Sequence, residues 1–198
     1  MVIVFDLGKV ILDFDHRVIT RRLARISGVF EARVHDLVFG RDLERMYDRG
    51  KMSSTGFYHT VVKSLGIEMP FEEFRDIWTG IFTANTEVCR IIEKLKKRYR
   101  LILLSNTNEM HFDYVLRTFE ILSAFDDYVL SYRVGERKPH PNVYAAALER
   151  AGCPASECVY VDDMEEYVGA ARRLGIHALV FRNAQQLEED LRALNVDV

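Results

Sequence analysis

Short apolar runs alternate with amphipathic stretches along most of this 198-residue chain. Five of the runs, rich in β-branched and aromatic residues, predict buried strands. They are residues 2–5, 100–104, 128–131, 158–161 and 177–181. Helical patterns precede each of the last four runs and close the chain, most clearly at 86–99, 142–152 and 184–194. Alternation of this kind is typical of a parallel sheet with helices on both faces.

The long segment after the first strand has a different pattern. Residues 16–85 form short helical stretches, two of which end at Gly40 and Gly50, and no strand pattern interrupts them. Ser53 and Pro70 suit the starts of two further helices. We therefore predict a doubly wound α/β core formed by residues 1–15 and 86–198. An all-helical cap domain, residues 16–85, is inserted after the first strand.

Composition narrows the class of partner. The formal net charge of −3 argues against a general nucleic-acid or membrane-surface binder, which needs a basic excess. No apolar run approaches the ~20 residues that span a bilayer. The cysteines Cys89, Cys153 and Cys158 lack metal-type spacing, and their odd number fits a reducing compartment. We expect a cytoplasmic monomer or homodimer that acts on a small molecule.

Polar groups that a plain α/β scaffold does not require follow several predicted strands. They are Asp6 with Gly8, Ser105 with Asn106, Lys138, and Asp162 with Asp163. The carboxyl ends of parallel strands meet at one rim, so these groups can converge there. Carboxylates suit Mg²⁺, a lysine and a hydroxyl suit a phosphate, and an aspartate can attack phosphorus. Taken singly, each group also fits helix capping or a surface loop.

The segments FDLGKV, LLSNTN, RKPHPNVY and VYVDD resemble, in order and spacing, the four motifs of the haloacid dehalogenase-like (HAD) hydrolase superfamily. The resemblance covers nearly the whole chain. It is greatest to small sugar-phosphate phosphatases of the α-D-glucose-1-phosphate phosphatase type. It implies a Rossmann-like core with a helical cap. It also implies a Mg²⁺-dependent phosphatase that cleaves a small phosphorylated metabolite, such as a sugar phosphate, through an aspartyl-phosphate.

The resemblance also implies a nucleophile and a metal site. Asp6 corresponds to the nucleophile that attacks the phosphoryl group in line. The carboxylates of Asp6 and Asp163 and the backbone carbonyl of Gly8 correspond to Mg²⁺ ligands. Asp162 corresponds to a residue beside them, in direct or indirect contact with the ion.

The phosphate-binding residues follow from the same resemblance. Ser105 corresponds to a donor to a phosphoryl oxygen, with the backbone of Asn106 beside it. Lys138 corresponds to the lysine that neutralises charge on both the nucleophile and the phosphate. Phosphoryl transfer depends mainly on this kind of electrostatic stabilisation.

Two positions depart from the family pattern. Most phosphatases of the superfamily carry a second aspartate, the general acid and base, where this chain has Gly8. Loss of such a group typically costs about 10²–10⁴-fold in rate. Asp13, Asp15 and His16 are the nearest replacements in the sequence. Tyr167 stands where relatives often have Asn or Asp near the metal.

Two other functions stay open at this point. A metal-independent 2-haloacid dehalogenase also lacks the second aspartate, although adjacent carboxylates at 162 and 163 have little use in a metal-free site. A non-catalytic relative that binds a ligand or a protein is compatible with Gly8. Release of halide without Mg²⁺ would indicate the first, and absence of turnover the second.

Specificity should lie in the cap, because the core residues contact only the phosphoryl group. Arg45, Tyr47, Arg49 and Trp78 are candidates to face the substrate. Taken singly, each is better explained by ordinary cap packing, for Tyr47 and Trp78, or by surface charge, for the two arginines. His140 lies between two prolines near the motif lysine and is a further candidate. Movement of the cap would admit substrate and exclude water.

Overall fold

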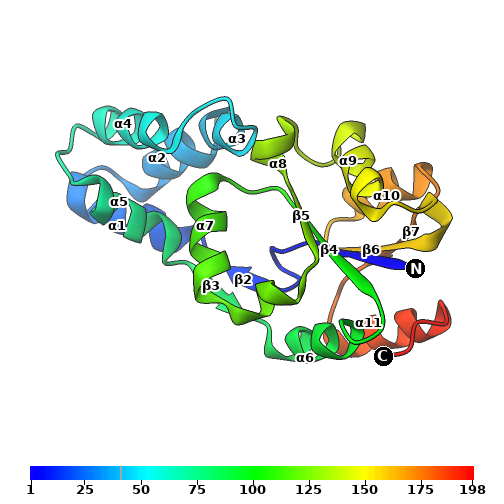
Figure 1. Cartoon of the computed structure of the whole chain (residues 1–198). Coiled ribbons are helices and arrows are strands. Elements are labelled where there is room, and N and C mark those ends of the chain that lie inside the picture. Colours follow the sequence, from blue (N-terminus) through cyan, green and yellow to red (C-terminus); the bar gives the residue numbers. More distant parts are fainter. Residues whose placement is uncertain (41) are drawn as a thin grey trace.

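The computed structural model describes residues 1–40 and 42–198. A five-stranded parallel sheet forms the centre of the core (Figure 1), in the order β5-β4-β1-β6-β7. Its strands are β1 (Val2–Phe5), β4 (Arg100–Ser105), β5 (Asp127–Leu130), β6 (Cys158–Asp162) and β7 (His177–Val180). All five predicted strands are present, and only their ends differ by a residue or two. The chain crosses from β5 at one edge to β6 beside β1, which creates a crevice at the carboxyl rim.

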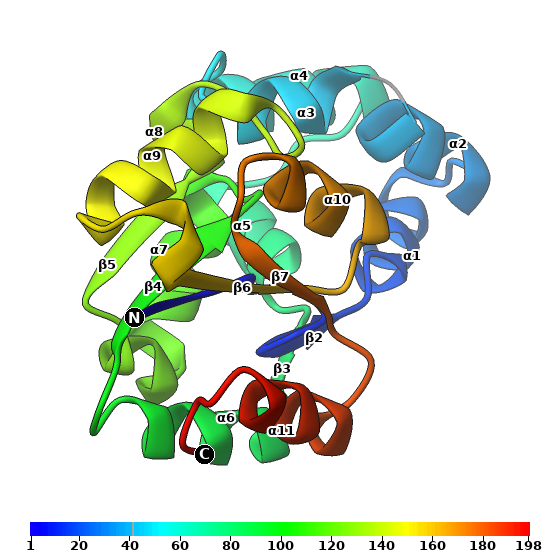
Figure 2. The same cartoon turned by 90° about the vertical axis from the view of Figure 1, so that its right-hand side faces the viewer.

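Helices cover both faces of the sheet, so the prediction of a doubly wound α/β core is confirmed. Val2 and Val4 point to one face, whereas Ile3 and Phe5 point to the other, because side chains alternate along a strand. One face packs on α6 (Thr86–Leu95), α7 (Glu109–Thr118) and α11 (Ala184–Ala193). The other face packs on α9 (Pro141–Ala151) and α10 (Glu165–Arg173). Figure 2 shows α6 and α11 below the sheet and α9 and α10 above it.

Short helical segments complete the core. They are η2 (Glu120–Ala124), α8 (Ser131–Val134) and η3 (Ala155–Glu157). Ser131, which the sequence places at the end of a strand, instead begins α8. Its buried hydroxyl donates to the carbonyl of Thr107 at 2.8 Å and accepts from the Thr107 amide at 2.9 Å. This contact ties the loop after β4 to the loop after β5.

The inserted segment forms a second group of helices beside the sheet, on the left of Figure 1. Its elements are α1 (Arg17–Ser27), α2 (Glu31–His35), the π-helix η1 (Asp36–Gly40), α3 (Asp42–Asp48), α4 (Ser54–Leu65) and α5 (Phe71–Thr79). These helices enclose a hydrophobic core of their own, which includes Phe57, Phe74 and Trp78. Met110 of α7 joins this core and links it to the sheet domain. The domain boundaries at 15/16 and 85/86 stay a prediction, and residue 41 lies outside the described residues.

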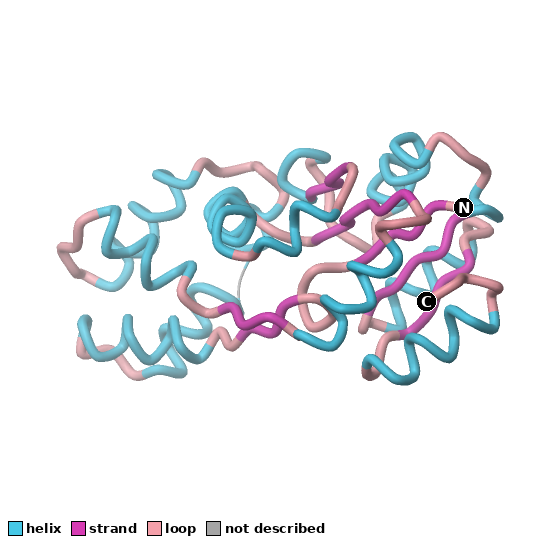
Figure 3. The backbone as a smooth tube through the Cα atoms, turned by 60° about the horizontal axis from the view of Figure 1, so that its bottom comes forward, coloured by secondary structure: helices cyan, strands magenta, loops and turns pink. Residues whose placement is uncertain are grey.

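The cap is not wholly helical, so that part of the prediction is wrong. β2 (Leu12–Phe14) and β3 (Phe82–Ala84) form a two-stranded antiparallel sheet where the cap meets the core (Figure 3). Each strand has only three residues, which is too short to show an alternating pattern. Their pairing joins segments about seventy residues apart, so only tertiary structure reveals it. In the part of the chain that the structure describes, no helix combines the length and apolarity needed to cross a membrane.

Candidate active site

Two buried ion pairs organise the carboxyl rim of the sheet. Asp6 follows β1 directly, and Lys138 lies in the loop between α8 and α9. The Lys138 Nζ lies 2.8 Å from Oδ1 of Asp6 and 2.6 Å from Oδ2 of Asp162, the last residue of β6. The lysine also donates to the carbonyl of Leu104 at 3.2 Å. Three neighbouring strands, β4, β1 and β6, therefore supply partners for a single ammonium group.

Asp162 is fully buried, and hydrogen bonds occupy both of its oxygens. Oδ2 accepts from Lys138 and from the hydroxyl of Tyr160, and Oδ1 accepts from the backbone amide of Met164 at 2.8 Å. Tyr167, one turn further along, places its ring 5.3 Å from the Lys138 ammonium. Asp162 and Tyr167 thus both lie against the lysine, and the aspartate holds it in place.

Asp6, Asp162 and Asp163 form a cluster in which one possible ligand atom from each lies within 4.8 Å of the others. Burial raises the pKa of Asp6 to about 7, although Lys138 opposes this effect, and burial together with Asp162 raises the pKa of Asp163. Burial by itself would lower the pKa of Lys138, but the two paired carboxylates raise it, so the lysine stays charged.

This cluster has the chemistry of a divalent-cation site. The cluster contains three carboxylates, and one ammonium group pairs with two of them, so the cluster carries an excess of negative charge when the acids are ionised. The raised pKa values of Asp6 and Asp163 show that this charge is costly in the buried rim. A divalent ion would offset it, and an all-oxygen donor set suits Mg²⁺. The residues therefore fit the metal that the family motifs imply.

Ser105 and Asn106 lie at the end of β4, beside the cluster. Ser105 is buried. The side chain of Asn106 makes two hydrogen bonds to the backbone of Lys138, accepting from its amide at 2.7 Å and donating to its carbonyl at 3.2 Å. Because these bonds hold the Asn106 side chain on the loop that carries Lys138, Asn106 would contact a phosphate through its backbone.

Gly8 leaves no room for a side chain. A Cβ atom at this position would lie 2.8 Å from Cε1 of Phe14. Asp13 and Asp15, two of the three residues that could replace the missing general acid, do not line the cavity between the inserted segment and this rim, which is described below. Asp13 is exposed and lies 3.5 Å from Lys9, and Asp15 pairs with Arg17, whose hydrogen bonds lower the Asp15 pKa to about 2.

A cavity of about 140 Å³ separates the cap from the rim. Its core wall includes Gly8, Ser105, Asn106 and Thr107. His16, Glu44 and Asp48 of the inserted segment and Arg137 of the loop between α8 and α9 also line the cavity. The sequence named His16 as a candidate and gave Arg137 only as the first residue of the RKPHPNVY motif. Glu44 and Asp48 are charged residues of a helical segment, where charge usually marks a solvent-exposed face, so their pattern gave no indication of a site.

Three of the groups that line this cavity, Asp48, Glu44 and His16, have shifted pKa values. Asp48 is buried, accepts from Nδ2 of Asn108 at 3.1 Å and lies 3.4 Å from Nε of Arg137. Burial and the neighbouring Asp48 raise the pKa of Glu44 to about 8. Burial lowers the pKa of His16 to about 4. At neutral pH, Glu44 therefore carries a proton and His16 does not.

The proposed specificity residues divide into two groups. Tyr47 and Trp78 are buried in the cap core, where Tyr47 also accepts from the amide of Met110 at 3.1 Å. The structure therefore supports a packing role for Tyr47 and Trp78. Arg45, Arg49 and His140, in contrast, line a second hollow of about 490 Å³ beside the lysine loop.

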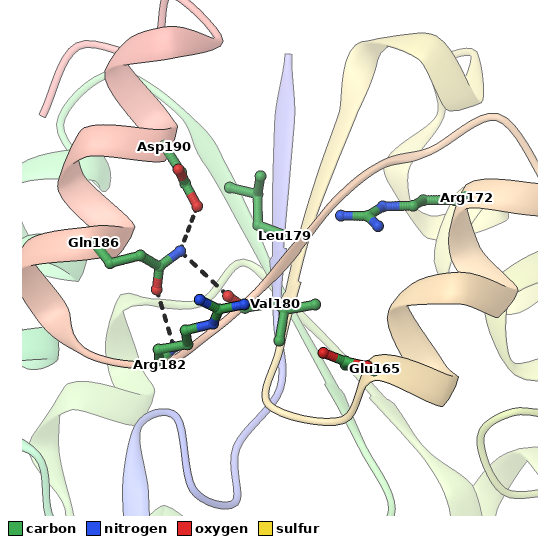
Figure 4. Close-up of a pocket in the computed structure, with 7 residues that line it drawn as sticks. All are labelled: Glu165, Arg172, Leu179, Val180, Arg182, Gln186 and Asp190. Carbon is green, nitrogen blue, oxygen red and sulfur yellow. Dashed lines mark hydrogen bonds between the residues drawn. The ribbon is translucent and has the colours of Figure 1, made fainter.

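A further polar hollow of about 510 Å³ lies along the edge strand β7 (Figure 4). Gln186 donates to the carbonyl of Val180 at 3.2 Å and Arg172 donates to that of Ala178 at 2.9 Å. These bonds occupy edge carbonyls that would otherwise be free to pair with another strand. This hollow contains none of the motif residues, and we assign it no part in the site.

The sequence matches the family of haloacid dehalogenase-like hydrolases over residues 1–175. D-ribitol-5-phosphate phosphatase from Bacteroides thetaiotaomicron is 27% identical over 205 residues, which cover 97% of each protein. A predicted HAD-like hydrolase from Porphyromonas gingivalis shares 26% identity and a TM-score of 0.84, covering 99% of this chain and 98% of that one.

A HAD family enzyme from Bacteroides thetaiotaomicron, solved with magnesium and inorganic phosphate, has the same fold. Its TM-score is 0.82 at 22% identity, with 91% of this chain and 93% of that chain covered. The resemblance to sugar-phosphate phosphatases as a group is therefore confirmed, whereas the resemblance to the α-D-glucose-1-phosphate phosphatase type is not. As its motifs predict, the chain belongs to the haloacid dehalogenase-like hydrolase family, and its place is among the phosphatases of that family.

Proposed function

We propose that this phosphatase hydrolyses a small phosphorylated metabolite, such as a sugar phosphate, with Mg²⁺ and with Asp6 as the nucleophile. The observation that carries the proposal is the carboxylate cluster of Asp6, Asp162 and Asp163, two of which pair with the buried ammonium of Lys138. A nucleophile, a fixed positive charge and a metal-type donor set thus meet at the rim where α/β folds bind ligands.

Asp6, Asp163 and the carbonyl of Gly8 would hold the metal, with Asp162 beside them. When bound, Mg²⁺ supplies positive charge that neutralises the phosphoryl oxygens and the charge that develops on them. Lys138 supplies a second positive charge on the side of the nucleophile, and its two carboxylate partners fix its position. The hydroxyl of Ser105, a buried residue, would donate to a phosphoryl oxygen.

In the reaction, a carboxylate oxygen of Asp6 forms a bond to phosphorus as the bond from phosphorus to the ester oxygen breaks. The alcohol leaves, and the phosphoryl group stays on Asp6. Water then attacks phosphorus, which releases inorganic phosphate and restores the carboxylate. The fixed charges around Asp6 favour both steps, because negative charge gathers on the phosphoryl oxygens in each transition state.

The size of the cavity supports a small substrate. Its volume of about 140 Å³ is well below the roughly 300–1,000 Å³ of pockets that enclose drug-sized ligands. A relative that covers 97% of this chain acts on D-ribitol 5-phosphate, by its name, which fits the same size class. The excess of buried carboxylates disfavours the metal-independent dehalogenase. The expected cytoplasmic location and the monomeric or homodimeric state stay predictions.

Turnover of phosphorylated metabolites with and without Mg²⁺ tests the proposal. We expect Mg²⁺-dependent release of phosphate that is lost in Asp6→Asn and kept in Asp113→Asn, which removes an exposed carboxylate on α7. Mg²⁺ at ~100 times its Kd should raise the free energy of unfolding by about 2.7 kcal/mol, and Asp163→Asn should reduce this gain. Turnover that is indifferent to Mg²⁺, or that survives in Asp6→Asn, would contradict the proposal.

A further inference from the structure

Cleavage of an alkyl phosphate needs a proton donor, because an alkoxide is a poor leaving group. Gly8 stands at the position that supplies this donor in most phosphatases of the family, and the ring of Phe14 fills the space that a side chain would need. The proton must therefore come from another wall of the cavity.

Two titratable groups of the cavity are already committed elsewhere. Asp48 accepts from Asn108 and pairs with Arg137. His111 is fully buried, with Nε2 3.0 Å from the carbonyl of Trp78 and Nδ1 3.2 Å from the Asn108 amide. Burial lowers the pKa of His111 to about 3, so it stays neutral, and its ring cannot exchange a proton with substrate without losing these partners.

Glu44 differs from both of these groups. Its side chain is 17% exposed and lines the same cavity as Gly8 and Ser105. Its nearest ion-pair contact among the described residues is Nε2 of His16 at 3.9 Å. The other charged groups that act on it, among the described residues, are Asp48 and Arg45 on its own helix and Arg137 after α8.

His16 lies beside this carboxyl group. Its ring stacks on Phe39 at 4.3 Å and packs against Phe14 at 4.9 Å, so its orientation is fixed between two aromatic side chains. Since burial keeps His16 neutral, it forms no charged pair that would hold Glu44 in the ionised form. Glu44 therefore keeps its proton near neutral pH, as a general acid must.

We propose that Glu44 is the general acid and base of this phosphatase, contributed by the cap in place of the side chain that Gly8 lacks. The inference rests on the proposed function. As the ester P–O bond breaks, its electron pair goes to the alkoxide oxygen, which takes the proton of Glu44 and leaves as the alcohol. The Glu44 carboxylate then takes a proton from the water that attacks the phosphoryl group on Asp6, which regenerates the acid.

The dependence of the rate on the leaving group tests this role. Glycerol 3-phosphate has a leaving group that needs a proton, whereas p-nitrophenyl phosphate has one that leaves as a stable anion. We expect Glu44→Gln to lower kcat/KM by about 10²–10⁴-fold for the alkyl ester and to leave it unchanged for the aryl ester. Asp42→Asn, which removes an exposed carboxylate from the same helix, should change neither.

The pH profile gives a second readout. With the alkyl ester, kcat/KM of the parent protein should fall above about pH 8, where Glu44 loses its proton, and Glu44→Gln should lack this decline. Equal losses on both esters would show that Glu44 binds or packs instead of donating a proton. No loss on either would also overturn the inference. A parent protein inactive on both esters would contradict the proposed function itself.

Discussion

Replacing Glu44 with glutamine should change how the stability of the fold depends on pH. Burial raises the pKa of Glu44 from 4.5 to about 8, so between these values the folded protein holds a proton that the unfolded chain has released. Stability from this group is therefore complete below pH 4.5 and is lost as the pH rises toward 8. The slope approaches about 1.4 kcal/mol per pH unit, so from about pH 6 to about pH 8 the loss is on the order of 2–3 kcal/mol.

Glutamine cannot titrate, so the variant should lack this part of the slope and gain stability relative to the parent as the pH rises. Urea denaturation of both proteins at several pH values, in the absence of Mg²⁺, measures the difference. Asp6 and Asp48 also have raised pKa values, but they are present in both proteins, so their main contributions cancel. Asp42→Asn controls for the loss of one negative charge on α3. Parallel slopes for parent and Glu44→Gln would refute the reasoning.

Two further substitutions test the rim. Lys138→Met leaves Asp6 and Asp162 without their buried partner, which should lower the free energy of unfolding by about 3–5 kcal/mol and abolish turnover; unchanged denaturation midpoints would contradict this. Gly8→Ala places a Cβ atom against the ring of Phe14 and should cost about 1–3 kcal/mol. A double-mutant cycle with Phe14→Leu should recover most of that loss, and additive effects would show that the contact is not responsible.

The sequence by itself determined the core and most of the rim. Apolar runs as short as four residues define the strands, because a strand buried on both faces needs no polar position. Once the strands are known to be parallel, a carboxylate such as Asp6 at a strand end has only one rim to occupy. For the same reason, the motif residues that follow neighbouring strands are expected to lie close together. The structure shows Lys138 in contact with both Asp6 and Asp162 at this rim.

Only the tertiary structure decided what faces that rim from the cap. A helical pattern indicates which side of α3 is polar, but not which of its charged residues lies over a rim formed by strands far away in the sequence. Glu44 acquires its raised pKa from burial and from the neighbouring Asp48, and burial is a property of the packed structure that no local pattern records. The β2–β3 pair and the ring of Phe14 over Gly8 have the same origin. Local periodicity fixes elements and their ends, whereas contacts between distant elements depend on how those elements pack.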